Sequence, residues 1–115
     1  MDKFQIQTED VESIHVMRMT GGIDGSNAPA FSQTLQEALD AGKHRIICDF
    51  LNVLIIGSTA IGALMTCQQK LTQQDGEICL AGPDPRLMKV LKLVQINQYF
   101  RIFDSVEDAL AALQS

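Results

Sequence analysis

Tryptophan is absent from this chain of 115 residues, which has one tyrosine, five phenylalanines and a formal net charge of −5. The sequence also contains no basic stripe with interleaved aromatic residues, which is the usual mark of a nucleic-acid-binding surface. We therefore expect no nucleic-acid partner. With only three prolines and a hydrophobic fraction of 46%, the chain does not have the composition of a disordered protein. We expect one folded domain over residues 1–115.

The sequence predicts neither a secretion signal nor a membrane helix. No basic segment followed by an apolar core and a cleavage site is found at the N-terminus. The longest uncharged run rich in apolar residues, residues 50–67, is interrupted by asparagine, glycine, serine and threonine. Such a run is typical of a strand, a turn and a helix. We expect a cytoplasmic protein that is not embedded in a membrane.

The three cysteines, Cys48, Cys67 and Cys79, lie far apart in apolar segments and form no C-x-x-C pair. This number and spacing argue against a disulfide framework and against a zinc site. We interpret them as buried apolar residues in a reducing compartment. His15 and His44 also lack the spacing of metal ligands. We therefore expect no metal ion and no cofactor.

Hydrophobic periodicity predicts the order β-β-α-β-α-β-α-β-α. The predicted strands are residues 4–7, 13–19, 45–50, 77–81 and 99–103, and the predicted helices are 27–42, 59–73, 84–94 and 105–113. Gly21 and Gly22 are expected to end the second strand, before a loop at residues 23–27. This order predicts a single-domain α/β fold, in which about four helices cover a mixed sheet of four to five strands.

The predicted helix after Pro85 has an apolar face and a basic face. Its buried face is predicted from the helical spacing of four residues, Leu87, Val90, Leu91 and Val94. The other face has three cations, Arg86, Lys89 and Lys92. We interpret these cations as a solvated surface.

The segment from Cys48 to Gly62 places hydroxyl groups at the start of a helix. An apolar strand is predicted to end at Asp49, a turn follows, and a second apolar run leads to Ser58 and Thr59. Free backbone N–H groups and the positive end of the helix dipole favour an anion there. A hydroxyl at this point caps a helix well, and it also accommodates a phosphate. Both roles remain open on this reasoning.

The usual catalytic motifs are missing. The sequence has no phosphate-binding loop, and Gly21, Gly22 and Gly25 do not have dinucleotide-binding spacing. Residues 57–60 lack the second glycine of a nucleophile elbow. We interpret Asp49 as a turn residue and not as a catalytic acid. We therefore expect that the protein is not an enzyme.

Three segments together resemble the STAS domain, the family of bacterial anti-sigma factor antagonists and of sulfate-transporter tails. Residues 21–28, which include Gly-Gly-Ile-Asp and Asn-Ala, resemble the family's loop before the first helix. Residues 49–62 resemble its strand and turn ending in Asp-Ser-Ser-Gly-Leu-Gly, and residues 103–110 resemble its closing helix. The order and spacing of these segments carry the assignment.

The resemblance implies a partner-switching mechanism. In the family, the unphosphorylated antagonist binds an anti-sigma factor that is a serine kinase, and thereby frees a sigma factor. Phosphorylation by the kinase releases the antagonist, and a serine phosphatase resets it. By position, the resemblance implies phosphorylation at Ser58, with Thr59 as second choice, in a monomer or weak dimer. The implied partner surface comprises Asp24, Asn27, Gly57, Ser58, Thr59, Ile61, Gly62 and Met65.

The chain departs from the family pattern beside the acceptor. Gly57 replaces the acid, Thr59 replaces the second serine, and Ala60 replaces a glycine. One alternative is a STAS subunit that is not phosphorylated, in a stress-signalling scaffold or a lipid-transporter complex. Another alternative is an enzyme or small-ligand carrier with a cleft near Ser58. In the binding and scaffold cases alike, residues 53–56 are expected to pack under the following helix.

Overall fold

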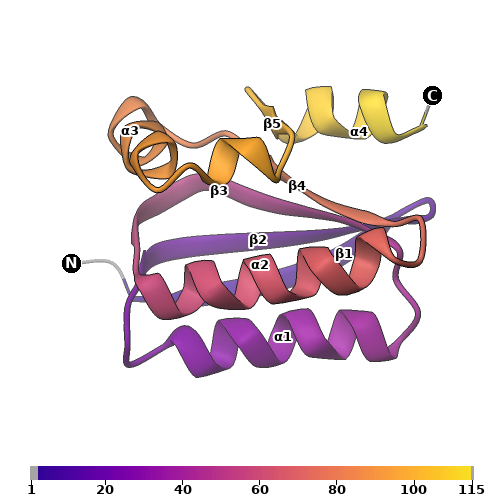
Figure 1. The fold of residues 1–115 in the computed structure, drawn as a ribbon, viewed down its shortest axis with the longest axis horizontal. Helices are drawn as coiled ribbons and strands as arrows, with labels where there is room; N and C mark the ends of the chain where they lie inside the picture. Colours follow the sequence, from indigo (N-terminus) through magenta and orange to yellow (C-terminus); the bar gives the residue numbers. More distant parts are fainter. Residues whose placement is uncertain (1–2, 115) are drawn as a thin grey trace.

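The computed structural model describes residues 3–114 as one five-stranded sheet covered by helices (Figure 1). The strand order is β1-β2-β3-β4-β5; β1 is antiparallel to β2, and the other neighbours are parallel. The strands are β1 (Gln5–Val11), β2 (Ile14–Ile23), β3 (Arg45–Ile56), β4 (Glu77–Ala81) and β5 (Ile102–Phe103). The helices are α1 (Ala28–Asp40), α2 (Ser58–Thr72), α3 (Pro85–Leu93), the 3-10 helix η1 (Ile96–Gln98) and α4 (Val106–Gln114). The predicted mixed α/β sheet with four α-helices is confirmed.

Two hydrophobic cores hold the helices on the sheet. The larger core contains Phe31 of α1, Leu64 of α2 and Leu91 of α3, all fully buried. α1 and α2 run side by side along the sheet, as Figure 1 shows. The smaller core joins α4 to β2, β3 and β4 through Val106 and Ala109. Burial of such side chains stabilises the fold by roughly 1.5–3 kcal/mol for each large residue.

Strands β2 and β3 are both longer than predicted. The prediction that Gly21 and Gly22 end the second strand is wrong, because β2 continues to Ile23. The predicted turn after Asp49 is also wrong, because β3 continues to Ile56 as one strand. Both errors arise because long-range pairing between β2 and β3 overrides the local turn preference of glycine and aspartate.

Asp49 is a buried strand residue and not a turn residue. Its Oδ2 atom accepts a hydrogen bond of 3.0 Å from Nη1 of Arg18 on β2, and its Oδ1 atom accepts the backbone N–H of Leu51. From Asp49 to Asn52 β3 advances by three residues while β2 advances by two, from Arg18 to Thr20, which is a β-bulge. The carboxylate therefore satisfies a backbone donor within the bulge.

The start of α3 follows the prediction, but its buried face is narrower. Asp84 caps the helix and accepts the N–H of Leu87 at 2.8 Å. Leu87 and Leu91 are buried, whereas Val90 and Val94 are 40% and 50% exposed. The predicted burial of these two valines is wrong, because α3 meets the core only along the stripe that contains the two leucines.

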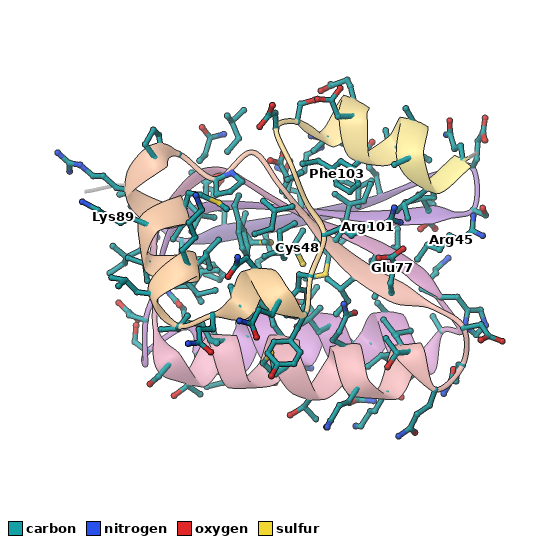
Figure 2. The ribbon with its side chains drawn as sticks, turned by 45° about the horizontal axis from the view of Figure 1, so that its top comes forward. Arg45, Cys48, Glu77, Lys89, Arg101 and Phe103 are labelled. Carbon is teal, nitrogen blue, oxygen red and sulfur yellow. The ribbon has the colours of Figure 1, made fainter. Side chains whose placement is uncertain are left out.

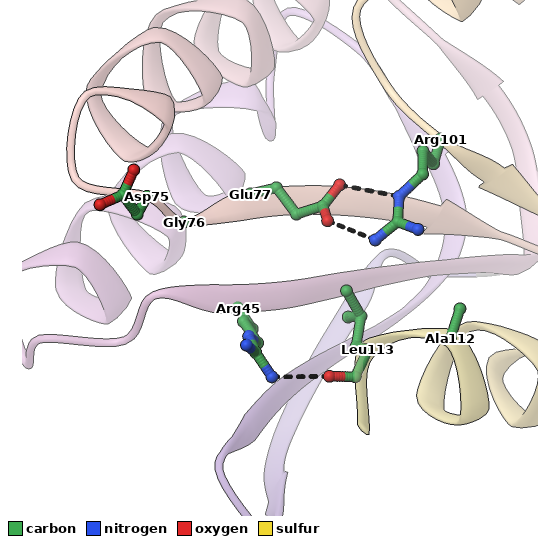
Figure 3. Close-up of a pocket in the computed structure, with 7 residues that line it drawn as sticks. All are labelled: Arg45, Asp75, Gly76, Glu77, Arg101, Ala112 and Leu113. Atoms are coloured by element: carbon green, nitrogen blue, oxygen red, sulfur yellow. Dashed lines mark hydrogen bonds and ion pairs between the residues drawn. The ribbon is translucent and has the colours of Figure 1, made fainter. Parts of the chain in front are cut away.

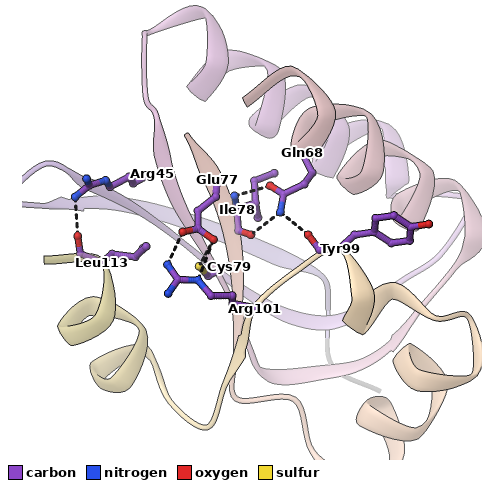
Figure 4. Close-up of polar contacts among 8 residues, drawn as sticks. All are labelled: Arg45, Gln68, Glu77, Ile78, Cys79, Tyr99, Arg101 and Leu113. Carbon is purple, nitrogen blue, oxygen red and sulfur yellow. Dashed lines mark hydrogen bonds and ion pairs between the residues drawn. The ribbon is translucent and has the colours of Figure 1, made fainter. Parts of the chain in front are cut away.

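The predicted strand at residues 99–103 is shorter in the structure, where β5 contains only Ile102 and Phe103. The side chain of Gln68 pairs with β4 where the first part of that strand was expected. Gln68 of α2 is 92% buried, and its Oε1 atom accepts the N–H of Ile78 on β4 at 2.7 Å. Its Nε2 atom donates to the carbonyl of Ile78 at 3.3 Å and to that of Tyr99 at 2.7 Å (Figure 4). The amide of Gln68 thus pairs with β4 as a neighbouring strand would.

All three cysteines are free and buried, which confirms their interpretation as buried apolar residues. Cys48, which is labelled in Figure 2, is a fully buried residue of β3, and burial raises the pKa of its thiol. Burial likewise raises the pKa of Cys79 to about 12. Among residues 3–114, no helix is long and apolar enough to span a bilayer.

We expect that Gln68→Leu lowers the free energy of unfolding by about 2–3 kcal/mol, because the N–H of Ile78 and the carbonyls of Ile78 and Tyr99 lose their bonds to the amide. Urea denaturation followed by circular dichroism would measure this loss. As a control, Gln69→Leu replaces the exposed neighbouring glutamine and should change the free energy of unfolding by less than about 0.5 kcal/mol. Equal effects of the two substitutions would show that the amide of Gln68 does not support β4.

Candidate functional site

The loop at residues 24–27, which follows β2, lies beside the start of α2, which follows β3, because β2 and β3 end at the same edge of the sheet. The backbone N–H of Gly57 donates to the carbonyl of Ile23 at 2.7 Å. A Cβ atom placed on Gly57 would lie 3.8 Å from the Cα atom of Asp24. The structure therefore brings Asp24 next to Gly57, the residue before Ser58, and Asn27 belongs to the same loop as Asp24.

Hydrogen bonds within residues 22–27 hold this loop in one shape. The carboxylate of Asp24 accepts the hydroxyl and the N–H of Ser26, at 2.6 and 2.9 Å. The amide of Asn27 accepts the N–H of Asp24 and donates to the carbonyl of Gly22, so it braces the loop and does not cap α1. The hydrogen bonds from Ser26 lower the pKa of Asp24, so this exposed carboxylate is ionised at neutral pH.

Ser58 is the first residue of α2, and Gly57 occupies the cap position with extended backbone. Of the two roles that the sequence left open for a hydroxyl here, the structure does not show capping, because the start of α2 has no side-chain cap hydrogen bond. Ser58 and Thr59 are both exposed. Neither hydroxyl has a hydrogen bond within residues 3–114. Both hydroxyls are therefore free to react or to bind, next to the unpaired N–H groups of the helix.

The first turns of α2 expose less apolar surface than the sequence suggested. Ile61 and Met65 are half-buried and pack against the larger core. Gly62 is exposed, and a Cβ atom placed on it would meet no atom within 4 Å. Gly62 is thus the most open of these three positions, and the fold does not require a glycine there.

Three exposed apolar residues near this edge were missed by the sequence analysis. Leu51, Leu54 and Ile55 of β3 are 65%, 51% and 60% exposed. The expectation that residues 53–56 pack under α2 is wrong for Leu54 and Ile55. A Cβ atom placed on Gly22 would lie 3.1 Å from Ile55, so this side chain adjoins the loop. Strand alternation alone would not have identified both exposed residues, because Leu54 and Ile55 are adjacent and a second irregularity in the β2–β3 register lies between Val53 and Ile56.

A cavity of about 180 Å³ lies at the opposite end of β3, lined by Arg45, Asp75, Gly76, Glu77, Arg101, Ala112 and Leu113 (Figure 3). Three of its four charged lining groups, Arg45, Glu77 and Arg101, already have partners. Both nitrogens of Arg101 that face Glu77 bind its carboxylate, and Arg45 donates to the carbonyl of Leu113 at 2.6 Å. These contacts join β3, β4, β5 and α4, so the cavity is a structural junction. Among residues 3–114, no group of three or more His, Cys, Asp or Glu side chains could hold a metal ion.

The fold and this edge define a small α/β domain whose exposed polar and apolar groups meet where β3 leads into α2. Residues 5–109 match the family model of the STAS domain. The chain therefore belongs to the STAS domain family.

Known anti-sigma factor antagonists resemble the chain along nearly its whole length. The anti-sigma F factor antagonist of Paenibacillus polymyxa is 20% identical over 111 residues, which cover 96% of this chain and 95% of that protein. The crystal structure of an anti-sigma factor antagonist from Mycobacterium paratuberculosis superimposes with a TM-score of 0.89 at 22% identity, covering 98% and 96% of the two chains.

SpoIIAA, an anti-sigma factor antagonist solved in two forms, has the same fold. Its unphosphorylated form gives a TM-score of 0.76 at 20% identity, covering 98% of this chain and 99% of that one. The phosphorylated form of the Bacillus protein gives 0.72 at 20% identity, covering 96% and 99%. At these identities, the structural likeness shows the fold.

We expect that Gly57→Asp raises the free energy of unfolding by about 0.5–1 kcal/mol, because a carboxylate at the cap accepts free N–H groups of α2. The backbone φ of Gly57 is −86°, and a new Cβ atom would lie 3.4 Å from the carbonyl oxygen of Ile23, an ordinary contact. Thermal unfolding would measure the gain. Gly57→Ala supplies the control without a carboxylate. If the two variants were equally stable, the start of α2 would not favour an anion.

Proposed function

We propose that this protein is an anti-sigma factor antagonist that binds an anti-sigma factor serine kinase and is released when Ser58 is phosphorylated. The observation that carries the proposal is the exposed hydroxyl of Ser58, which begins α2 and contributes no hydrogen bond to the fold. A phosphoryl group can be added there without breaking a native contact. Thr59 is the second candidate acceptor. A serine phosphatase would restore the starting form.

A phosphate at Ser58 has opposite effects on folding and on docking. The free N–H groups and the dipole of α2 favour a dianion at this point, so the domain stays folded. The same dianion adds charge to a surface where Asp24 is already ionised. Desolvating this charge against a partner would oppose binding by roughly 2–4 kcal/mol, on the order of a hundredfold in affinity. The switch therefore needs no conformational change.

The surroundings of Ser58 have the composition of a docking surface. Leu54 and Ile55 provide exposed apolar area, and the braced loop provides the fixed polar groups of Asp24 and Asn27. Glycine inside a helix costs roughly 1 kcal/mol relative to alanine, yet no contact within the domain requires Gly62. Close approach of a partner over α2 gives this glycine a role.

The relatives support the same assignment. The protein from Paenibacillus polymyxa is an anti-sigma F factor antagonist, and SpoIIAA exists in unphosphorylated and phosphorylated forms with this fold.

Gly57, in place of the family's acid, favours the second candidate function. In that case the domain is a STAS subunit of a stress-signalling scaffold or of a lipid-transporter complex, and it is not phosphorylated.

We expect one added phosphate when the protein is incubated with ATP and a lysate of its own host, and we expect peptide mapping to place it on Ser58. Intact mass spectrometry would measure the addition. Ser58→Ala should abolish it, whereas Thr59→Ala should retain it. The lysate must phosphorylate a known antagonist as a positive control. No addition under those conditions would favour the scaffold or transporter subunit.

We expect that Gly62→Arg slows phosphorylation of Ser58 at least tenfold in the same assay, because a long side chain blocks the partner's approach over α2. Its thermal stability should rise, since arginine is a better helix former by about 0.5–1 kcal/mol. Gln69→Arg, on the exposed part of the same helix, should leave the rate unchanged. Equal rates in both variants would place the kinase elsewhere on the domain.

A further inference from the structure

Helix α3 presents a second exposed surface, on a part of the chain distinct from the Ser58 edge. Four of its residues recur at positions i, i+3, i+4 and i+7 and therefore share one face: Arg86, Lys89, Val90 and Leu93. Leu93 is 76% exposed and Val90 is 40% exposed. The buried stripe, which contains Leu87 and Leu91, lies on the other side of the helix. We call the exposed four residues, with Lys92 beside them, the α3 face.

The α3 face concentrates positive charge in an acidic protein. Three of the nine Lys and Arg residues of the chain lie on this helix of nine residues, which contains no Asp or Glu. The rest of the chain has six basic and fourteen acidic residues, a formal charge of −8. Arg18, Lys43 and Arg101 all form ion pairs. Within residues 3–114, none of the three α3 cations does.

We propose that the α3 face binds the anionic surface of a lipid bilayer, with the helix lying flat among the headgroups. Cations attract acidic headgroups, and Val90 and Leu93 between them can enter the boundary with the acyl chains. Figure 2 shows Lys89 pointing away from the body of the domain, as this contact requires.

The composition of α3 fits lipid better than an acidic protein. Two of its three cations are lysines, which are depleted at protein–protein interfaces, and the helix has no aromatic residue to act as an anchor. Lysine is a point charge on a flexible stem, so it can follow mobile headgroups without fixed geometry.

Asp84 is an acid at the start of α3, and its carboxylate is engaged as the helix cap by the N–H of Leu87. Glu9 and Asp10 lie on β1, three strands away from β4, which leads into α3. At roughly 4.8 Å between strands, this separation is about 14 Å, which exceeds the Debye length of about 8 Å at physiological salt. Helix α4, whose first turn contains Glu107 and Asp108, lies on the opposite side of the view in Figure 1 from α3. Binding should therefore be weak, salt-sensitive and dependent on anionic lipid.

Vesicle co-sedimentation with the whole protein tests the proposal. We expect binding to vesicles of equal parts phosphatidylglycerol and phosphatidylcholine, little binding to phosphatidylcholine alone, and a decline as salt rises. One cation near an anionic bilayer raises binding about fivefold, so Lys89→Glu, which reverses one charge, should lower the partition coefficient about 25-fold. Lys70→Glu makes the same charge change on α2 and should alter it less than about threefold, because the site is remote from the bilayer.

A second variant separates apolar insertion from charge. Leu93→Ser should weaken binding several-fold and leave the salt dependence unchanged, because it removes apolar area and no charge. Circular dichroism would verify that each variant is folded. The proposal is overturned if wild-type protein does not bind the anionic vesicles, or if Lys70→Glu weakens binding as much as Lys89→Glu. Retention on immobilised poly-glutamate without vesicle binding would assign the α3 face to an acidic protein instead.

Discussion

The hydrogen bond from the N–H of Gly57 to the carbonyl of Ile23 is the contact on which the functional edge depends. It extends the pairing of β2 with β3 to Ile23, the last residue of β2, and to Gly57, the residue before α2. Because the two strands end together, the loop that carries Asp24 lies against the first turn of α2. Ser58 is thereby presented on a rigid element, which is what the proposed modification and partner contact would require.

The broad architecture could be predicted because local signals agree with it. Alternation of strands and helices predicted the mixed sheet. Asp84 and Ser105 were correctly assigned to helix starts, and both side chains accept an N–H group three residues ahead. These signals act within one turn of the chain, so no tertiary information is needed. The position of Ser58 at a helix start was likewise predictable, although Gly57 holds the cap.

The missed features all depend on contacts between distant residues. Asp49 pairs with Arg18, which lies 31 positions earlier, and this contact keeps an acid inside a strand where local preference predicts a turn. Gln68 replaces a strand beside β4 through bonds to residues 10 and 31 positions away. The exposure of Leu54 and Ile55 follows from the extension of β3, which the predicted turn concealed. Each feature becomes visible only once the neighbouring chain is in place.

The burial of the cysteines has a consequence for signalling under oxidative conditions. Oxidants and disulfide reagents react with the thiolate, and burial keeps the thiols of Cys48 and Cys79 protonated at physiological pH. All three sulfur atoms lie inside the folded domain. A peroxide burst would therefore find no reactive thiolate at Cys48 or Cys79, and the phosphorylation proposed at Ser58 would not depend on the oxidation of these two thiols.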